Sequence, residues 1–129
     1  ILFHKDFKYT VGIADRRLVG RSAGRGMARK LPVYLPSPTL ELALEAVAAR
    51  MRKACDMDFE RGEDGETVIR FGRCAIREVC RTRSTPVGGE LCRIFHYCMD
   101  GEICELACRP IRSHVAPDDE SCTVRLETK

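Results

Sequence analysis

The feature that most constrains the fold is a pattern that occurs twice: an amphipathic helix followed by two short strands around a turn. The first copy has a helix at 40–54 and a hairpin at 58–71, and the second has a helix at 90–107 and a hairpin at 110–126. Apolar residues recur at helical spacing in the helices, and turn-forming residues separate the strands. A short helix at 74–82 joins the copies. The pattern predicts an α+β fold in which an antiparallel sheet of four strands, or slightly more, is packed on one face by helices, with the αββ unit repeated.

The first 38 residues differ in charge from the rest of the chain. They hold eight Lys or Arg against two Asp, whereas the remainder holds 14 basic and 17 acidic side chains. Alternating apolar and polar residues predict a strand at 7–13, and a glycine-rich, basic stretch at 21–26 predicts a loop. We therefore divide the chain into a basic strand-and-loop arm at 1–38 and an α+β domain at 39–129. The arm suits an anionic partner, although a solvated tail explains the same charges.

The high cysteine content is the compositional feature that most restricts the possible chemistry of the chain. The chain has eight, and seven of them fall within 49 residues. We find no secretory signal and no apolar run of the roughly 18–20 residues that a membrane span needs, so we expect a cytoplasmic location and no membrane partner. Because the chain begins with Ile1, we expect its natural start to lie upstream. A domain of 129 residues does not need disulfides to fold. The thiols could therefore serve metal or redox chemistry, be buried as structural side chains, or form disulfides.

The spacing of the cysteines excludes the short metal motifs. No Cys-x2-Cys pair occurs, so zinc ribbons, rubredoxin-like knuckles and thioredoxin-like dithiols have no support. The remaining spacing is wide, and it makes a single site only if the fold brings distant elements together. The candidate ligands for a transition metal or an iron–sulphur cluster are Cys74, Cys92, Cys104 and Cys122.

The two long helices allow finer predictions. Ser37 is expected to cap the first helix. On the second helix, Cys92 and His96 share the apolar stripe that faces the core, whereas Cys104 and Cys108 share a different, outward face. One straight helix therefore does not present all of these groups to one ion. His96 is equally explained as a core histidine, and each cysteine as a small buried apolar residue.

A catalytic function has less support than a binding function. Cys92 or Cys104 could act as a nucleophile beside His96, with Glu102 or Glu105 orienting the histidine. The chain has no nucleophile elbow, no paired-carboxylate site and no His-Glu-x-x-His motif. A cysteine-dependent hydrolase stays an alternative, but we expect a protein that is not an enzyme.

Residues 39–129 resemble a known sensor module in outline. The segments that carry the resemblance are Asp56-Met57-Asp58-Phe59 before the first hairpin, Cys74-Ala75-Ile76-Arg77-Glu78-Val79, Leu91-Cys92, and Asp119-Glu120-Ser121-Cys122-Thr123-Val124. Their order is similar to the four-vinyl reductase domain, a small α+β ligand-binding module whose closing pattern is Gly-Asp-x-x-Cys-x-Phe. It is also similar to the effector domain of winged-helix regulators that carry an iron–sulphur cluster. Here Ala75 stands where those regulators have proline, and Asp118 where the closing pattern has glycine.

The resemblance implies a role in sensing, as in transcription regulation. It maps Cys74, Cys92 and Cys122 onto the family's cysteine positions, with Cys104 as the fourth. We therefore expect a cytoplasmic sensor or ligand-binding domain that holds a metal ion or iron–sulphur cluster. The alternative is a metal-free module for an apolar small molecule, of hydrocarbon or tetrapyrrole type, between helices and sheet. An exposed N-terminal strand would also suit pairing into a homodimer.

Overall fold

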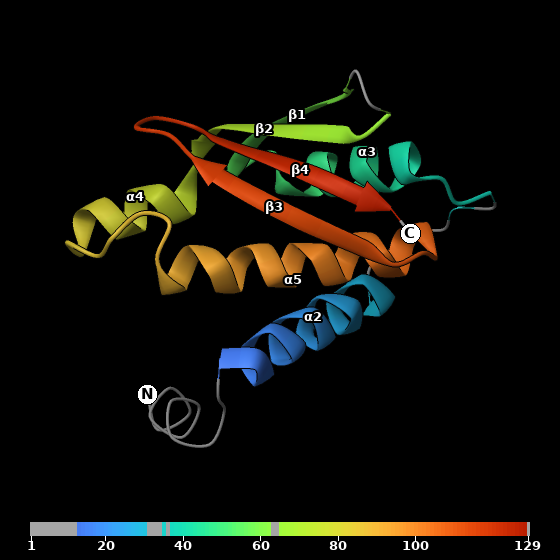
Figure 1. The fold of residues 1–129 in the computed structure, drawn as a ribbon, viewed down its shortest axis with the longest axis horizontal. Coiled ribbons are helices and arrows are strands. Elements are labelled where there is room, and N and C mark those ends of the chain that lie inside the picture. Colours follow the sequence, from blue (N-terminus) through green and yellow to red (C-terminus); the bar gives the residue numbers. More distant parts are fainter. Residues whose placement is uncertain (1–12, 31–34, 36, 63–64, 129) are drawn as a thin grey trace.

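The computed structural model describes residues 13–30, 35, 37–62 and 65–128. Within them the chain forms four helices and four strands. Two of the helices and all four strands make two αββ units, as the sequence predicts (Figure 1). A helix precedes the first unit, and a short helix joins the two. In chain order the elements are α2 (Ile13–Lys30), α3 (Leu40–Met51), β1 (Cys55–Arg61), β2 (Thr67–Cys74), α4 (Ala75–Thr82), α5 (Glu90–Ala107), β3 (Ile111–Pro117) and β4 (Cys122–Thr128).

The strands form one antiparallel sheet in the order β1-β2-β4-β3. Each αββ unit contributes one hairpin, and the hairpins join where β2 pairs with β4. Ile69 stands opposite Val124 at this junction, and Phe71 stands opposite Cys122. Ile69, Phe71 and Val124 are all buried, so the two central strands supply the apolar floor of the core. The predicted α+β fold with a four-stranded antiparallel sheet is confirmed.

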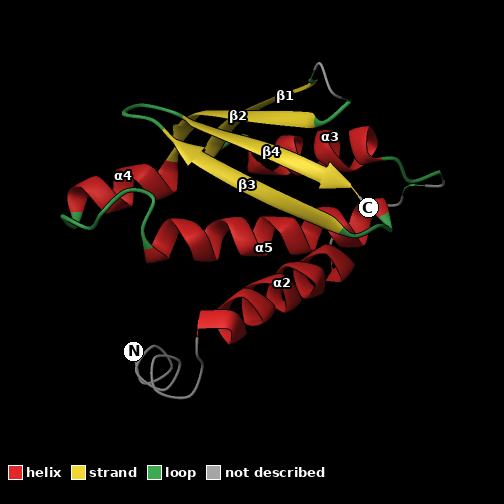
Figure 2. Cartoon of the chain, in the orientation of Figure 1, coloured by secondary structure: helices red, strands yellow, loops and turns green. Residues whose placement is uncertain are grey.

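Helices α3 and α5 lie on one side of the sheet (Figure 2). Their apolar stripes meet Ile69, Phe71 and Leu126 of the strands in a single cluster. Helix α3 supplies Leu44 and Val47, both fully buried. The predicted cap at Ser37 is wrong: Thr39 caps this helix, because its hydroxyl accepts a hydrogen bond from the backbone N–H of Leu42 (3.1 Å).

The loop predicted at 21–26 is wrong, because this stretch lies within the 18-residue helix α2. The helix packs along α5, on the side away from the sheet (Figure 1). Of the strand predicted at 7–13, residues 7–12 lie outside the described residues, and Ile13 begins α2. Of the two glycines that suggested a loop, Gly24 has a different role in the structure, as a contact between helices.

Three glycines let the backbones of α2 and α5 touch. A Cβ on Gly24 would lie 1.8 Å from the carbonyl oxygen of Cys98, and a Cβ on Gly101 would lie 2.1 Å from that of Arg21. A Cβ on Gly20 would lie 2.7 Å from the Cβ of Tyr97. Any side chain at these positions would therefore separate the two helices. Gly101 does not break α5, which runs without interruption through it.

Helix α5 also carries two buried acidic groups, Asp100 and Glu102. Asp100 is 4% exposed and accepts a hydrogen bond from the hydroxyl of Ser113 (2.6 Å), and Arg21 of α2 lies 4.0 Å from the same carboxylate oxygen. Burial raises the pKa of Asp100 to about 6, against the opposing effects of Ser113 and Arg21. Glu102 pairs with Arg50 of α3. These polar contacts fix α5 against its three neighbours.

Substitution of Gly24 tests the helix contact. Gly24→Ala should lower the free energy of unfolding by roughly 1–3 kcal/mol, because the new methyl group would force the α2 and α5 backbones apart. Gly26→Ala is the matched control, since nothing lies within 4 Å of a Cβ there. The control should stabilise the helix by up to about 1 kcal/mol through its better helix propensity. Thermal and denaturant unfolding measure both changes, and equal effects would contradict the close packing.

The raised pKa of Asp100 predicts a pH-dependent effect of Asp100→Asn. Between about pH 4 and pH 6 the folded protein holds a proton on this carboxyl that the unfolded chain releases. The free energy of unfolding of the parent is therefore highest, with respect to this group, at low pH, and it falls as pH rises through about 6. Asparagine keeps the acceptor for Ser113 without the charge. The free energy of unfolding of the variant, relative to that of the parent, should therefore rise by about 3 kcal/mol between about pH 4 and pH 7.5, measured by denaturant unfolding. A difference that does not change with pH would contradict the burial cost.

Candidate functional site

Three of the four predicted ligands line one pocket between α5 and the end of the sheet. Cys74 closes β2, Cys122 opens β4, and Cys92 lies in the first turn of α5. The two strand residues lie at the same end of the sheet because β2 and β4 are antiparallel, with Cys122 opposite Phe71 and Cys74 three residues further along β2. The other lining residues are Phe71, Ile76, Arg77, Val87, Phe95 and His96.

Arg77 is the charged group of this pocket, and it was not predicted from the sequence. Its side chain reaches from α4 to the turn between β3 and β4 and is only 5% exposed. The guanidinium donates hydrogen bonds to the carbonyl oxygens of Asp118 (2.9 Å), Asp119 (2.7 Å) and Ser121 (2.8 Å). It also donates a hydrogen bond to the sulphur of Cys122 (3.1 Å). Its Nε is buried and has no partner among the described residues.

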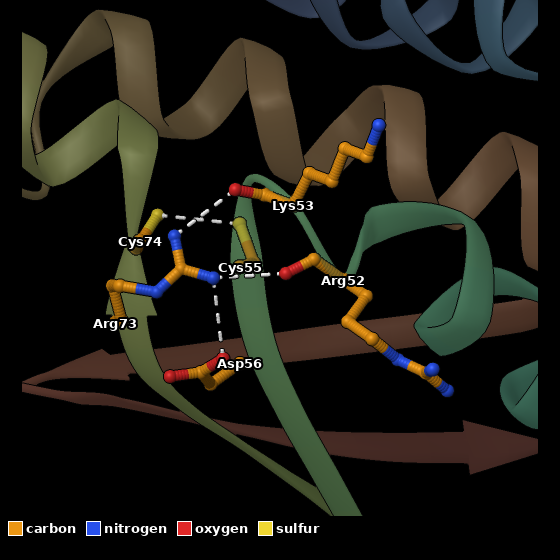
Figure 3. A network of polar contacts seen from close by, with 6 residues as sticks. All are labelled: Arg52, Lys53, Cys55, Asp56, Arg73 and Cys74. Carbon is orange, nitrogen blue, oxygen red and sulfur yellow. Dashed lines mark hydrogen bonds and ion pairs between the residues drawn. The ribbon is translucent and has the colours of Figure 1, made fainter.

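Cys74 has a second thiol beside it, that of Cys55. The two sulphurs lie 3.8 Å apart, and the Cys55 thiol donates to Cys74 (Figure 3). This contact lowers the pKa of Cys74 to about 6, with help from the backbone N–H groups of Ile76 and Arg77 at the start of α4. The same contact, together with burial, raises the pKa of Cys55 far above its ordinary value. Cys74 is therefore the thiolate of the pair near neutral pH.

His96 lies in an aromatic environment. Its ring makes edge-to-face contacts with Phe71 (5.5 Å between ring centres) and Phe95 (5.3 Å). Burial lowers the pKa of His96 to about 4, so the imidazole is neutral near pH 7. A neutral imidazole is both a metal ligand and a tolerable core residue, and the predicted place of His96 on the apolar stripe of α5 is correct.

A further thiol pair lies behind the pocket. Cys80 of α4 and Cys92 have sulphurs 4.0 Å apart, and both side chains are buried. Burial is the main cause that raises the pKa of Cys80. The sequence analysis did not predict that Cys55 lies beside Cys74 or that Cys80 lies beside Cys92. Neither the spacing of the cysteines nor the periodicity of apolar residues shows which strand and helix ends lie together.

Cys104 lies apart from the pocket. It is buried in the main core, where its sulphur lies 4.0 Å from the carbonyl oxygen of Ile111. The predicted outward pair is therefore wrong in part, because only Cys108 is exposed. Within the described residues no three Cys, His, Asp or Glu side chains are close enough together to hold a metal ion as they are oriented.

Two cavities meet at Cys92 and His96. The thiol-lined pocket has an accessible volume of only about 10 Å³, room for about one water molecule. A more open cavity of about 290 Å³ lies on the other side of these residues, lined also by Tyr97, Val115 and Pro117. The first has room for a single atom or ion, and the second for a small organic molecule.

The carboxylates predicted as orienters of His96 have other partners in the described part of the chain. Glu102 pairs with Arg50, and Glu105 pairs with Arg29 (2.8 Å), so both carboxylates suggested as orienters of His96 are engaged elsewhere. The residues that line the pocket with His96 include no carboxylate.

Comparison with known proteins shows a likeness in fold alone. No protein-family model and no curated protein matches the chain. Among solved structures, an H-NOX protein from S. oneidensis in the Fe(II)NO ligation state is similar, with a TM-score of 0.53 and 10% identity over 98% of this chain and 71% of that one. None of the described helices combines the length and apolarity that a membrane crossing requires.

Arg77→Lys tests whether the buried guanidinium holds the pocket together. Lysine cannot reproduce the planar set of donors to three carbonyl groups and a sulphur, so the free energy of unfolding should fall by about 2–3 kcal/mol. Arg81→Lys is the control, because Arg81 donates from an exposed position to the same turn, at Asp119 (2.9 Å). That change should cost less than about 1 kcal/mol. Equal losses in denaturant unfolding would contradict a special role of Arg77.

Proposed function

We propose that the chain is a ligand-binding sensor domain and that its ligand is a single thiophilic transition-metal ion. The observation that carries the proposal is that Cys74, Cys92 and Cys122, from three separate elements, all line one small pocket. Thiolates and neutral imidazole are the ligands that zinc and similar ions prefer. His96 lines the same pocket and completes a set of four candidate ligands.

The charges of the pocket support this ligand class. Three thiolates would be costly to bury alone, whereas three thiolates, a divalent ion and the Arg77 guanidinium together are neutral. The hydrogen bond from Arg77 to the sulphur of Cys122 is of the kind that stabilises a ligating thiolate. The low pKa of Cys74 lets it ligate at neutral pH.

The size of the pocket favours one ion over a cluster. About 10 Å³ has no room for the several atoms of an iron–sulphur cluster. Binding would still need rotation of the cysteine side chains toward a common point, since no three of the described ligands converge as they stand. Cys104 is too deep in the core to take part, so the proposal replaces it with His96.

A second candidate function is binding of an apolar small molecule. The cavity of about 290 Å³ beside Cys92 and His96 is near the lower limit of ordinary ligand pockets, and Tyr97, Val115 and Pro117 give it apolar walls. This is the type of ligand expected for a four-vinyl reductase-like module. The similar H-NOX protein, which was crystallised in an Fe(II)NO ligation state, is compatible with either ligand class.

Titration of the reduced chain with Co²⁺ under anaerobic conditions tests the metal proposal. We expect one ion per chain and the charge-transfer absorption of cobalt bound to thiolates. Cys74→Ser, Cys92→Ser and Cys122→Ser should each weaken binding by at least about tenfold. Competition with Zn²⁺ should remove the absorption.

Two other cysteines are matched controls for the titration. Cys108→Ser changes an exposed thiol and should leave the affinity unchanged. Cys104→Ser should also leave the affinity for Co²⁺ unchanged. A loss of affinity in this variant would instead favour the site predicted from the sequence, with Cys104 and not His96 as the fourth ligand. A reduced, folded protein that binds no Co²⁺ would exclude the metal function. Mass spectrometry of a copurified small molecule would then support the second candidate.

A further inference from the structure

Cys55 and Cys74 are placed to react with each other. They stand directly opposite across the β1–β2 ladder, and the neighbouring backbone bond from the N–H of Ala75 to the carbonyl of Ala54 (2.8 Å) marks them as a non-hydrogen-bonded pair. Such pairs have the shorter separation between Cα atoms, within the range that a disulfide can bridge. Their sulphurs are 3.8 Å apart, so bond formation requires only a small rotation of the side chains.

Arg73 holds this end of the hairpin in place. Its guanidinium donates to the carbonyl oxygens of Lys53 (3.0 Å) and Arg52 (2.8 Å), in the turn that leads into β1, and contacts the carboxylate of Asp56 (3.3 Å) (Figure 3). These contacts join the segment on both sides of Cys55 to the strand that ends at Cys74. The two thiols therefore stay opposite each other in the folded protein.

We propose that Cys55 and Cys74 form a redox-active dithiol that a low-molecular-weight disulfide converts to a protein disulfide. The Cys74 thiolate attacks the small disulfide, forming a mixed disulfide and releasing one thiolate. Cys55 then loses its proton, and its sulphur attacks the sulphur of Cys74 and releases the second small thiolate. Starting from the Cys74 thiolate, the protein gives up two electrons and the proton of Cys55, and the small disulfide is reduced to two small thiolates, which take up protons from solvent according to their own pKa.

The difference in exposure between the two cysteines sets this order of steps. Cys74 is partly exposed, so a small disulfide can reach it from solvent. Cys55 is 1% exposed, so it reacts only with its neighbour. The other close pair, Cys80 and Cys92, has sulphurs 4.0 Å apart, but Cys80 is 0% and Cys92 only 9% exposed. Both are less exposed than Cys74, so the first attack should be slower at that pair.

Closure of this disulfide would also withdraw Cys74 from the thiol-lined pocket. This consequence rests on the proposed metal-binding function, whereas the dithiol chemistry does not. The experiment is therefore done on metal-free protein in the presence of a chelator, so that failure of the dithiol and failure of the metal site give different results.

The test treats the reduced, folded full chain with glutathione disulfide, alkylates the remaining thiols and maps the peptides without reduction. We expect two glutathione molecules released per chain and a Cys55–Cys74 crosslink. A Cys80–Cys92 crosslink should form at least about tenfold more slowly. A crosslink that forms first at Cys80–Cys92, or a chain that keeps all its thiols, would overturn the proposal.

Single substitutions separate the two steps. Cys55→Ser should stop the reaction at a glutathione adduct on Cys74, and Cys74→Ser should leave Cys55 unmodified. Cys80→Ser is the matched control and should crosslink Cys55 to Cys74 at the rate of the parent. Should Cys55→Ser fold poorly, Cys55→Ala serves the same purpose. An adduct on Cys55 in the Cys74 variant would show that the assigned order is wrong.

Discussion

Backbone contact between α2 and α5, which Gly20, Gly24 and Gly101 permit, lets α5 be buried on two sides. One side of the helix meets the sheet and α3, and the other meets α2. Helix α5 is therefore the fixed element against which the ends of β2 and β4 position their cysteines. Because α5 has little exposed surface left, it also carries the buried histidine and carboxylates whose pKa values are displaced.

The eight thiols fall into distinct environments instead of one cluster. Cys74, Cys92 and Cys122 share a pocket with a buried arginine, Cys55 is an interior partner of Cys74, and Cys104 belongs to the core. Each environment favours a different chemistry, since an arginine and helix N–H groups favour a thiolate whereas an apolar core favours the neutral thiol. Cys74 belongs to two environments, which is why it takes part in both proposals.

The repeated αββ pattern and the α+β class could be predicted because helical and strand periodicities are local properties of the chain. The same reasoning placed Cys92 and His96 on the core stripe of α5, and both are buried. It failed for α2, because glycine is a poor helix former locally and only the partner helix explains its use there. It also failed for Cys104, whose outward face on an isolated helix is covered in the folded protein.

The sequence by itself determined the order of the elements from residue 40 onward, the central position of α5 residues in the core, and the supply of thiols. Tertiary structure alone decided which thiols meet, because Cys55 and Cys74, or Cys92 and Cys122, come together only when strand ends and a helix start are brought to one place. It also decided that Arg77 lies inside this site, since its hydrogen bonds reach residues more than 40 positions away. Local periodicity contains no information about contacts at that separation, and the chemistry of the pocket depends on them.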